Sequence, residues 1–406
     1  GKPMFEKKNL IINCDVCDAR KVKEETLSGY EHIIINTDLL LVNERSKEAF
    51  AKFPIICNMT SSLELDEEVN CISENGHYEI AASTAVASNT VLAVNGDLVI
   101  HPGTQEVLQS FLAISVNGSV RCPASLSPYL KNLSVNGSTD YYPDDCIVLD
   151  SDFTPDAYFP LRVKEGGRYY VKNRVCLTDQ KLDIPSLAAK GIQFVTPSVL
   201  VGEASVPDAL SLFDETVKLQ IIPAGYAYAG RDVRLDQALL AKHGSRLYVE
   251  GSLTLDQSSA PLLSRIEGLK VNGTVCLPAS LLDAFQGLGA EYENLTLLKG
   301  KILQSKPMAT INASLLNACP DGLSVRSCAL VRIAKDVSPE QILEKTQFES
   351  CASIFCSEEQ KSAVELVSNS VAFIGAQEEK EAGGGIGDML GNLLSSRVVN
   401  ADLHVL

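Results

Sequence analysis

Few residues of this chain have types and spacings that could carry out chemistry. Cys14 and Cys17 form a Cys-x-x-Cys pair, which in other proteins binds zinc or exchanges disulfides. Zinc requires four ligands, and Thr37 and Leu40, which the repeat described below would stack beside the pair, cannot serve. The sequence favours structural cysteines, and it leaves a redox or metal role for Cys14 and Cys17 open.

Two other features have chemical counterparts in known sites. A nucleophilic Ser or Cys needs a histidine base, and we expect the five histidines to be surface or edge residues (His32, His77, His101, His243 and His404). The segment 383–388 is glycine-rich, as phosphate-binding loops are, but it lacks their Gly-Lys-Ser/Thr ending and follows an acidic stretch. We interpret it as a flexible linker. The sequence thus predicts no enzyme activity, cofactor or metal site.

Composition argues against several classes of partner. The 406 residues contain 35 Lys and Arg against 51 Asp and Glu, a net charge of −16. Binding to nucleic acid or anionic lipid requires a basic surplus, so we expect neither partner. No stretch of 18 apolar residues or N-terminal signal is visible. The 12 cysteines lie in strand-like stretches, which indicates free thiols in a reducing compartment. We therefore expect a cytoplasmic, bacterial-type protein.

An asparagine recurs in one phrase, apolar-x-apolar-Asn-Gly-x-apolar-x-apolar. Clear copies are Leu92–Ile100, Ile114–Cys122 and Leu269–Leu277, and a fourth carries Glu250 in the asparagine position, which we call the anchor. Most successive anchors are 19 to 27 residues apart, the period of a solenoid coil. The gap of 37 residues after Asn58 is longer, which suggests an insertion or a degenerate turn.

The positions around the anchor suggest a buried face. Apolar residues recur three and one before the anchor and three after it, so they would share one face of a strand. The position after the anchor falls on the same face and is small, as where a strand bends or another backbone approaches. These small positions are Gly96, Gly118, Gly137, Gly251, Gly273 and Gly300.

The asparagine anchors would line up when the strands stack in parallel. We expect them to form a structural amide ladder, with neighbours about 4.8 Å apart, rather than a ligand site. The ladder residues are Asn13, Asn36, Asn58, Asn95, Asn117, Asn136, Asn272 and Asn400.

Short helical patterns follow the strands, each started by Ser, Pro or Asp, as at Pro278-Ala279-Ser280. The predicted fold is an α/β repeat solenoid of stacked parallel short strands with short helices on one edge. In period and in strand-then-helix order it resembles leucine-rich-repeat proteins, and in its stacked strands parallel β-helix solenoids. The resemblance concerns architecture alone, because here Asn follows Val directly and Gly follows Asn. It therefore implies no functional residue.

The predicted organisation has three parts. Residues 1–8 form an N-terminal tail or an expression remnant, 9–380 the solenoid, and 381–406 a Gly-rich linker with a terminal strand. In that strand Asn400 repeats the anchor, and Val399, Leu403 and Val405 take the core positions. An open last strand would favour a homo-oligomer through the C-terminal edge.

The leading functional hypothesis is a non-enzymatic scaffold or protein-interaction module that presents a long rigid β surface to an unknown protein partner. A solenoid enzyme or ligand-binding protein acting on a polymer is the alternative, and it would need carboxylates or bases on adjacent coils. A self-assembling structural element is a third hypothesis.

Overall fold

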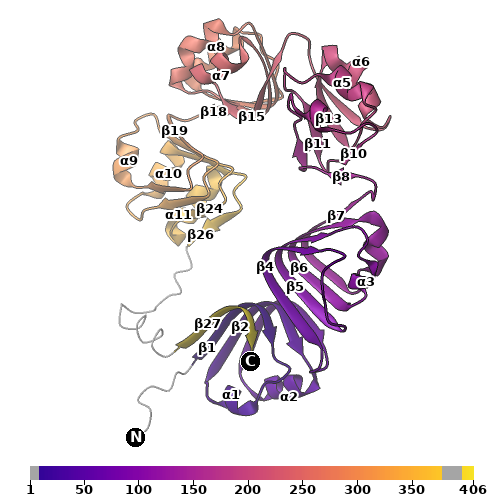
Figure 1. Cartoon of the computed structure of the whole chain (residues 1–406). Coiled ribbons are helices and arrows are strands. Elements are labelled where there is room, and N and C mark those ends of the chain that lie inside the picture. Colours follow the sequence, from indigo (N-terminus) through magenta and orange to yellow (C-terminus); the bar gives the residue numbers. More distant parts are fainter. Residues whose placement is uncertain (1–8, 377–395) are drawn as a thin grey trace.

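Parallel strands dominate the structure, a computed structural model that describes residues 9–376 and 396–406. Six sheets of four strands and one of three are present in the described chain, and the strands within each sheet are parallel. Figure 1 shows them grouped into five units that follow one another around an open ring. The predicted repetitive parallel α/β architecture is confirmed at this level.

Unit 1 contains sheet A, in the order β27-β1-β2-β3, and two helices that follow β1 and β2. The Asn43 side chain caps the second helix by accepting a hydrogen bond from the Ser46 amide at 2.9 Å. Leu10, Ile12 and Ile33 lie in the core between strands and helices. The elements are β1 (Asn9–Asp18), α1 (Glu24–Ser28), β2 (His32–Val42), α2 (Glu44–Lys52), β3 (Ile55–Glu64) and β27 (Ser396–Val405).

Unit 2 contains sheet B, in the order β4-β5-β6-β7. Leu92, Val94 and Leu98 of one strand all lie in its core, as the predicted columns require. The elements are β4 (Asn70–Ile80), β5 (Thr90–Ile100), α3 (Gln105–Leu108), β6 (Phe111–Pro123), η1 (Ala124–Tyr129) and β7 (Leu133–Tyr142).

Unit 3 differs because each coil is split at the bend into two short strands, which gives sheets C (β12-β10-β8) and D (β14-β13-β11-β9). Its elements are β8 (Ile147–Val148), β9 (Asp152–Phe153), α4 (Phe159–Arg162), β10 (Arg168–Tyr170), β11 (Arg174–Leu177), α5 (Ile184–Ala189), β12 (Gln193–Val195), β13 (Ser198–Gly202), η2 (Glu203–Ser205), α6 (Val206–Ala209), η3 (Leu210–Leu212) and β14 (Lys218–Ile222).

Unit 4 returns to long bent strands in sheet E, in the order β15-β16-β17-β18. Its elements are β15 (Ala227–Arg234), α7 (Gln237–His243), β16 (Arg246–Thr254), η4 (Gln257–Arg265), β17 (Gly268–Pro278), η5 (Ala279–Leu281), α8 (Leu282–Gln286) and β18 (Asn294–Leu298).

Unit 5 is split like unit 3, into sheets F (β19-β21-β23-β25) and G (β20-β22-β24-β26), and a serine with positive φ lies at the bend of each coil (Ser305, Ser327, Ser350 and Ser370). Its elements are β19 (Lys301–Gln304), β20 (Met308–Ile311), α9 (Ala313–Asn317), β21 (Leu323–Arg326), β22 (Leu330–Ile333), α10 (Pro339–Lys345), β23 (Thr346–Glu349), β24 (Ser353–Phe355), α11 (Glu358–Leu366), β25 (Ser368–Asn369) and β26 (Phe373–Gly375).

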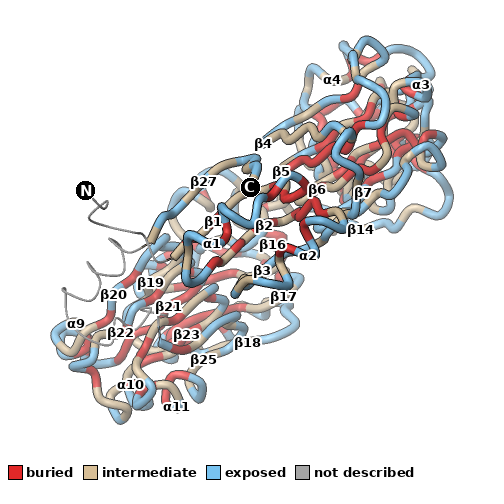
Figure 2. Tube along the Cα trace, turned by 90° about the horizontal axis from the view of Figure 1, so that it is seen from below, coloured by how far each residue is buried: buried red, intermediate tan, exposed pale blue. Residues whose placement is uncertain are grey.

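The expectation of one continuous strand stack is wrong. Pairing stops between β3 and β4, between β14 and β15, and at the other unit boundaries. There the outer faces of neighbouring sheets pack together, as where Val16 and Leu39 of sheet A contact Val91 and Ala93 of sheet B. Burial of apolar side chains thus replaces backbone pairing at the junctions. Figure 2 shows buried segments running through the units, with exposed segments around their rims.

The C-terminal strand is present, but it does not extend the last coils. β27 pairs with β1 at the opposite end of the chain, with Asn400 beside Asn13. Val399 packs into the core of unit 1, whereas Leu403 and Val405 are exposed, which corrects their predicted core positions. The N-terminal tail at 1–8 and the glycine-rich segment 383–388 lie outside the described residues.

Candidate functional site

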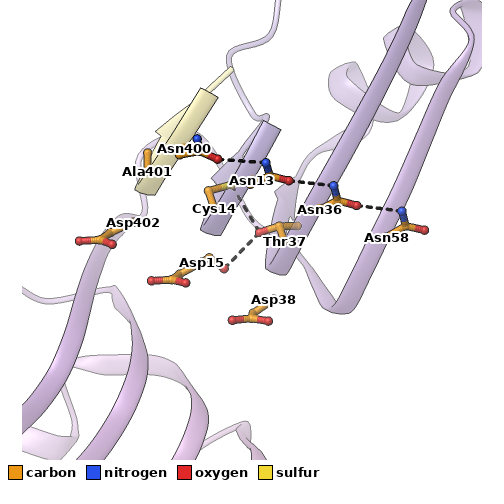
Figure 3. Close-up of a pocket in the computed structure, with 10 residues that line it drawn as sticks. All are labelled: Asn13, Cys14, Asp15, Asn36, Thr37, Asp38, Asn58, Asn400, Ala401 and Asp402. Atoms are coloured by element: carbon orange, nitrogen blue, oxygen red, sulfur yellow. Dashed lines mark hydrogen bonds between the residues drawn. The ribbon is translucent and has the colours of Figure 1, made fainter. Parts of the chain in front are cut away.

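The candidate site is an open groove of roughly 700 Å³ on sheet A, formed where the two ends of the chain meet. We call it the ladder groove. Figure 3 shows its asparagines in a row across four strands and its aspartates in a second row, nearer to unit 2. Its lining residues are Asn13, Cys14, Asp15, Asn36, Thr37, Asp38, Asn58, Asn400, Ala401 and Asp402.

Side-chain amides bond to one another along the groove. Asn13 Nδ2 donates to Asn400 Oδ1 at 3.0 Å, Asn36 Nδ2 to Asn13 Oδ1 at 2.8 Å, and Asn58 Nδ2 to Asn36 Oδ1 at 2.9 Å (Figure 3). Parallel pairing in register brings the four anchors side by side and thereby creates the row. Each amide in the middle of the row is both donor and acceptor, so the row tightens the sheet.

A second amide row lies on sheet B. Asn117 Nδ2 donates to Asn95 Oδ1, and Asn136 Nδ2 to Asn117 Oδ1, both at 3.3 Å. Asn272 lies in sheet E beside Glu250 rather than beside another asparagine. The anchors therefore form short rows within units and not one long column, because the strand stack is interrupted at each junction.

The aspartates two residues after the sheet A anchors bind the anchors of sheet B. Asn95 Nδ2 donates to Asp15 Oδ1 at 3.0 Å, Asn117 Nδ2 to Asp38 Oδ2 at 3.0 Å, and Asn75 Nδ2 to Asp402 Oδ1 at 3.2 Å. We call these three contacts the Asp–Asn pairs. They join both chain ends and unit 2 at one place.

Asp15 is the aspartate of this row whose charged form is least well stabilised. Burial raises the pKa of Asp15 above its ordinary value, against the hydrogen bond from Asn95, and the charges of Asp402 and Asp38 raise it further. Its Oδ2 atom is buried and has no hydrogen-bond partner among the described residues. The aspartate row thus combines a structural contact with one carboxylate that is poorly solvated.

The Cys-x-x-Cys pair lies at the edge of the groove. Cys14 is half-buried and its Sγ is 3.7 Å from Thr37 Oγ1, whereas Cys17 is fully buried. The hydrogen bond with Cys17 lowers the pKa of Cys14, in spite of its burial, and the same contact together with burial raises the pKa of Cys17. Within the described chain, no group of three or more His, Cys, Asp or Glu side chains could hold a metal ion.

The glycines after the anchors are crowded by backbone. A Cβ on Gly118 would lie 2.0 Å from the Gly96 carbonyl oxygen, and one on Gly273 would lie 1.8 Å from that of Gly251. A Cβ on Gly96 or Gly137 would meet a glycine carbonyl of the adjacent strand in the same way. Gly300 is obstructed by the Gly322 carbonyl, and Gly251 by the Asp232 side chain.

Sequence reasoning missed Asn75 and the aspartate row. Asn75-Gly76 lies inside the long gap after Asn58 and pairs in register with Asn95-Gly96, so the gap holds a full coil rather than an insertion. Its strand carries Ser73 and Glu74 just before the anchor, which hid the apolar phrase. Asp15, Asp38 and Asp402 all lie two residues after an anchor, a column that the sequence already displayed.

A second buried polar cluster joins units 3 and 4. Glu250 accepts hydrogen bonds from Arg174 at 2.8 and 2.9 Å, from Gln220 at 2.9 Å and from Tyr228 at 2.6 Å. Burial raises the pKa of Glu250, but these donors outweigh burial and hold it at about 2. Every oxygen of the carboxylate is occupied by the protein itself, so this cluster is a structural clamp.

The comparisons with known proteins add no family. No protein-family model matches the chain, and neither a curated protein nor a solved structure matches it. Among the described residues, no helix is both long and apolar enough to span a membrane.

Proposed function

We propose that this chain is a non-enzymatic protein-interaction scaffold whose units act together as one solenoid. The observation that carries the proposal is the set of Asp–Asn pairs, in which polar groups of the groove form hydrogen bonds that join unit 1 to unit 2. Hydrogen bonds within the asparagine row add to the same rigidity. A rigid block that exposes a polar groove suits the holding of partners at fixed spacing.

The chemistry of the groove favours a partner rich in hydrogen-bond donors and positive charge. One oxygen each of Asp38 and Asp402 binds an asparagine, which leaves the second oxygen of each for a partner, whereas Oδ2 of Asp15 is buried. The net charge of −16 adds a long-range attraction for a basic segment. A lysine- or arginine-bearing loop of another protein would complement both features.

Retention of partners on the immobilised full chain tests this function. Asn58 is exposed at the end of the asparagine row, so Asn58→Arg introduces bulk and positive charge into the groove. Ser28→Arg makes the same charge change on the exposed helix side of unit 1. We expect a protein retained by the wild type and by Ser28→Arg to be lost by Asn58→Arg. Retention that is indifferent to Asn58→Arg would contradict the role of the groove.

The alternative of a polymer-acting enzyme gains one observation. Asp402, Asp15 and Asp38 lie on adjacent strands in an open groove, and the raised pKa of Asp15 suits a proton donor. Release of reducing ends from a panel of neutral polysaccharides would support this alternative if Asp15→Asn abolished it without lowering Tm. Absence of release across the panel would contradict it.

A further inference from the structure

One packing rule recurs at the junctions between units. Each strand bends near its anchor. At a junction, the parts of the strands that precede the bend in the later unit pack, by their outer face, on the parts that follow the bend in the earlier unit. At the first junction Val91 and Ala93 of β5 cover Val16 and Leu39 of sheet A. At the junction of units 3 and 4, tyrosines of sheet E pack on Cys176, Leu200 and Ile222 of sheet D.

The other two junctions follow the same direction. Tyr170 of β10 donates to Asp140 of β7 at 2.5 Å, which joins the segments before the bend in unit 3 to those after the bend in unit 2. Gln347 of β23 donates to the Leu297 carbonyl of β18 at 3.4 Å, which joins unit 5 to unit 4. Each unit thus presents one face to the unit before it and another to the unit after it.

In the described part of the chain no unit packs on the corresponding face of unit 1, and this face is apolar. The register of sheet A aligns Val398, Ile11, Ile34 and Ile56 across all four strands, opposite to the core of unit 1. Ile56 is 60% exposed and Val398 47% exposed. None of the four belongs to an apolar cluster of the described residues. We call this row the head face.

Among the described residues no unit packs on the corresponding face of unit 5, which carries apolar residues beside Thr310 and Arg332. Ala309, Val331 and Ile354 of sheet G point into the core, so the alternate residues point outward. Among these, Met308 is 56% and Phe373 45% exposed. The outward residues form two rows in register, Met308–Leu330–Ser353–Phe373 and Thr310–Arg332–Phe355–Gly375, and we call their apolar members Met308, Leu330, Phe355 and Phe373 the tail face.

We propose that the tail face of one copy docks on the head face of a second copy, and so repeats between molecules the junction built within the chain. Figure 1 places units 1 and 5 at the two ends of the open ring. The exposure of Ile56, Met308 and Phe373 shows that the described chain covers neither face by itself. Exposed apolar patches mark interaction sites, and units at the ends of repeat proteins ordinarily carry polar outer faces.

The occupant is a second copy because the two faces are counterparts at every junction. The tail face lies after the bend, where a following unit packs, and the head face lies before the bend, where a unit packs on the one before it. A contact between different faces of identical chains is heterologous, and it continues into a filament or closes into a larger ring. β27 is the edge strand of sheet A and contributes Val398 to the head face. The inference goes beyond the scaffold function proposed above and does not depend on it.

Mixing two variants of the full chain tests the proposal. Ile56→Asp alters only the head face and Phe373→Asp only the tail face, and both positions are exposed, so folding is preserved. We expect the wild type to grow with concentration in steps of 43.7 kDa by light scattering, and each variant alone to remain a monomer. Mixed together, the variants retain one intact head and one intact tail face, so they should form a one-to-one dimer.

Leu161→Asp is the matched control, because Leu161 is 77% exposed in unit 3, outside both faces, and this variant should assemble like the wild type. If the wild type is monomeric in a dilute sample and remains monomeric when it is concentrated 100-fold, the proposal is overturned. It is also overturned if only one of the two face variants abolishes assembly, since that result indicates a symmetric contact. Loss of a foreign partner in the Asn58→Arg experiment leaves these outcomes unchanged.

Discussion

The strands of sheets A and B both have an anchor asparagine, but they bend after it in different ways. In sheet B the residue after each anchor is glycine with positive φ, and strand register continues through the bend. In sheet A that residue is Cys14, Thr37, Met59 or Ala401, none with positive φ, and the pairing of β1 with β2 skips Asp15 and Asp38 without a change of register.

The two kinds of bend differ in which face the following residues occupy. In sheet B, Val94 and Leu98, four residues apart, share the core of unit 2. In sheet A, Ile12 lies in the core of unit 1, but Val16 lies on the opposite face, against unit 2. Because Cys14 pairs with Thr37 and Val16 with Leu39, the register is kept, and each strand turns its later side chains over at the unpaired aspartate. In sheet A, where no glycine follows the anchor, Val16 and Leu39 therefore lie on the apolar face on which unit 2 docks.

The largest expected effect comes from the glycine column of sheet B. Gly118→Val places a branched side chain 2.0 Å from the Gly96 carbonyl oxygen, and strain and overpacking together should lower the free energy of unfolding by about 4 kcal/mol. Gly103→Val is the control, since Gly103 also has positive φ but meets nothing within 4 Å. Equal urea midpoints for the two variants would refute the role of the neighbouring backbone.

A somewhat smaller effect is expected at the junction itself. Leu39 is 1% exposed and lies between sheets A and B, so Leu39→Ala should cost about 3 kcal/mol and loosen unit 1 from unit 2. Limited proteolysis should then cut near Asp66–Val69, where Arg20 binds two carbonyls. Leu98→Ala, at the same anchor position in sheet B, should destabilise unit 2 without that cut. The same cleavage in both variants would argue against the flipped face.

The asparagine row should respond according to position. Asn117 bonds to Asp38, Asn95 and Asn136, so Asn117→Ala should lower the free energy of unfolding by about 1.5 kcal/mol. Asn136 lies at the sheet edge with one bond in the row, and Asn136→Ala should cost about 0.5 kcal/mol. Thermal melts of the pair measure the difference, and a larger loss at Asn136 would contradict the Asp–Asn pairs.

The smallest effect concerns pH. Because the pKa of Asp15 is raised in the folded chain, its charged form destabilises the fold once pH rises above its ordinary value near ~4. Asp15→Asn should therefore raise Tm slightly at pH 7, while Asn95 keeps an acceptor, and the gain should shrink toward pH 4. A gain that grows on acidification would show that the pKa of Asp15 is lowered instead.

Local pattern alone accounts for much of the fold. Apolar residues one and three before most anchors lie in the cores, as Ile33 and Ile35 do in unit 1, because side-chain alternation in a strand depends only on neighbouring residues. The short helices after the strands follow from their capping residues, as with Ser338 before α10. The repeating parallel α/β architecture was therefore accessible from the amino-acid sequence.

Tertiary structure decided which strands stack and where stacking stops. The phrase around Asn400 predicts a strand, but nothing in those ten residues indicates that it pairs with β1, at the opposite end of the chain. The face taken by Val16 and Leu39 likewise depends on how a whole strand passes its bend. Strand identity is a local property, whereas pairing, the face taken after a bend and the junctions between units are settled by the apolar surface that distant segments bury together.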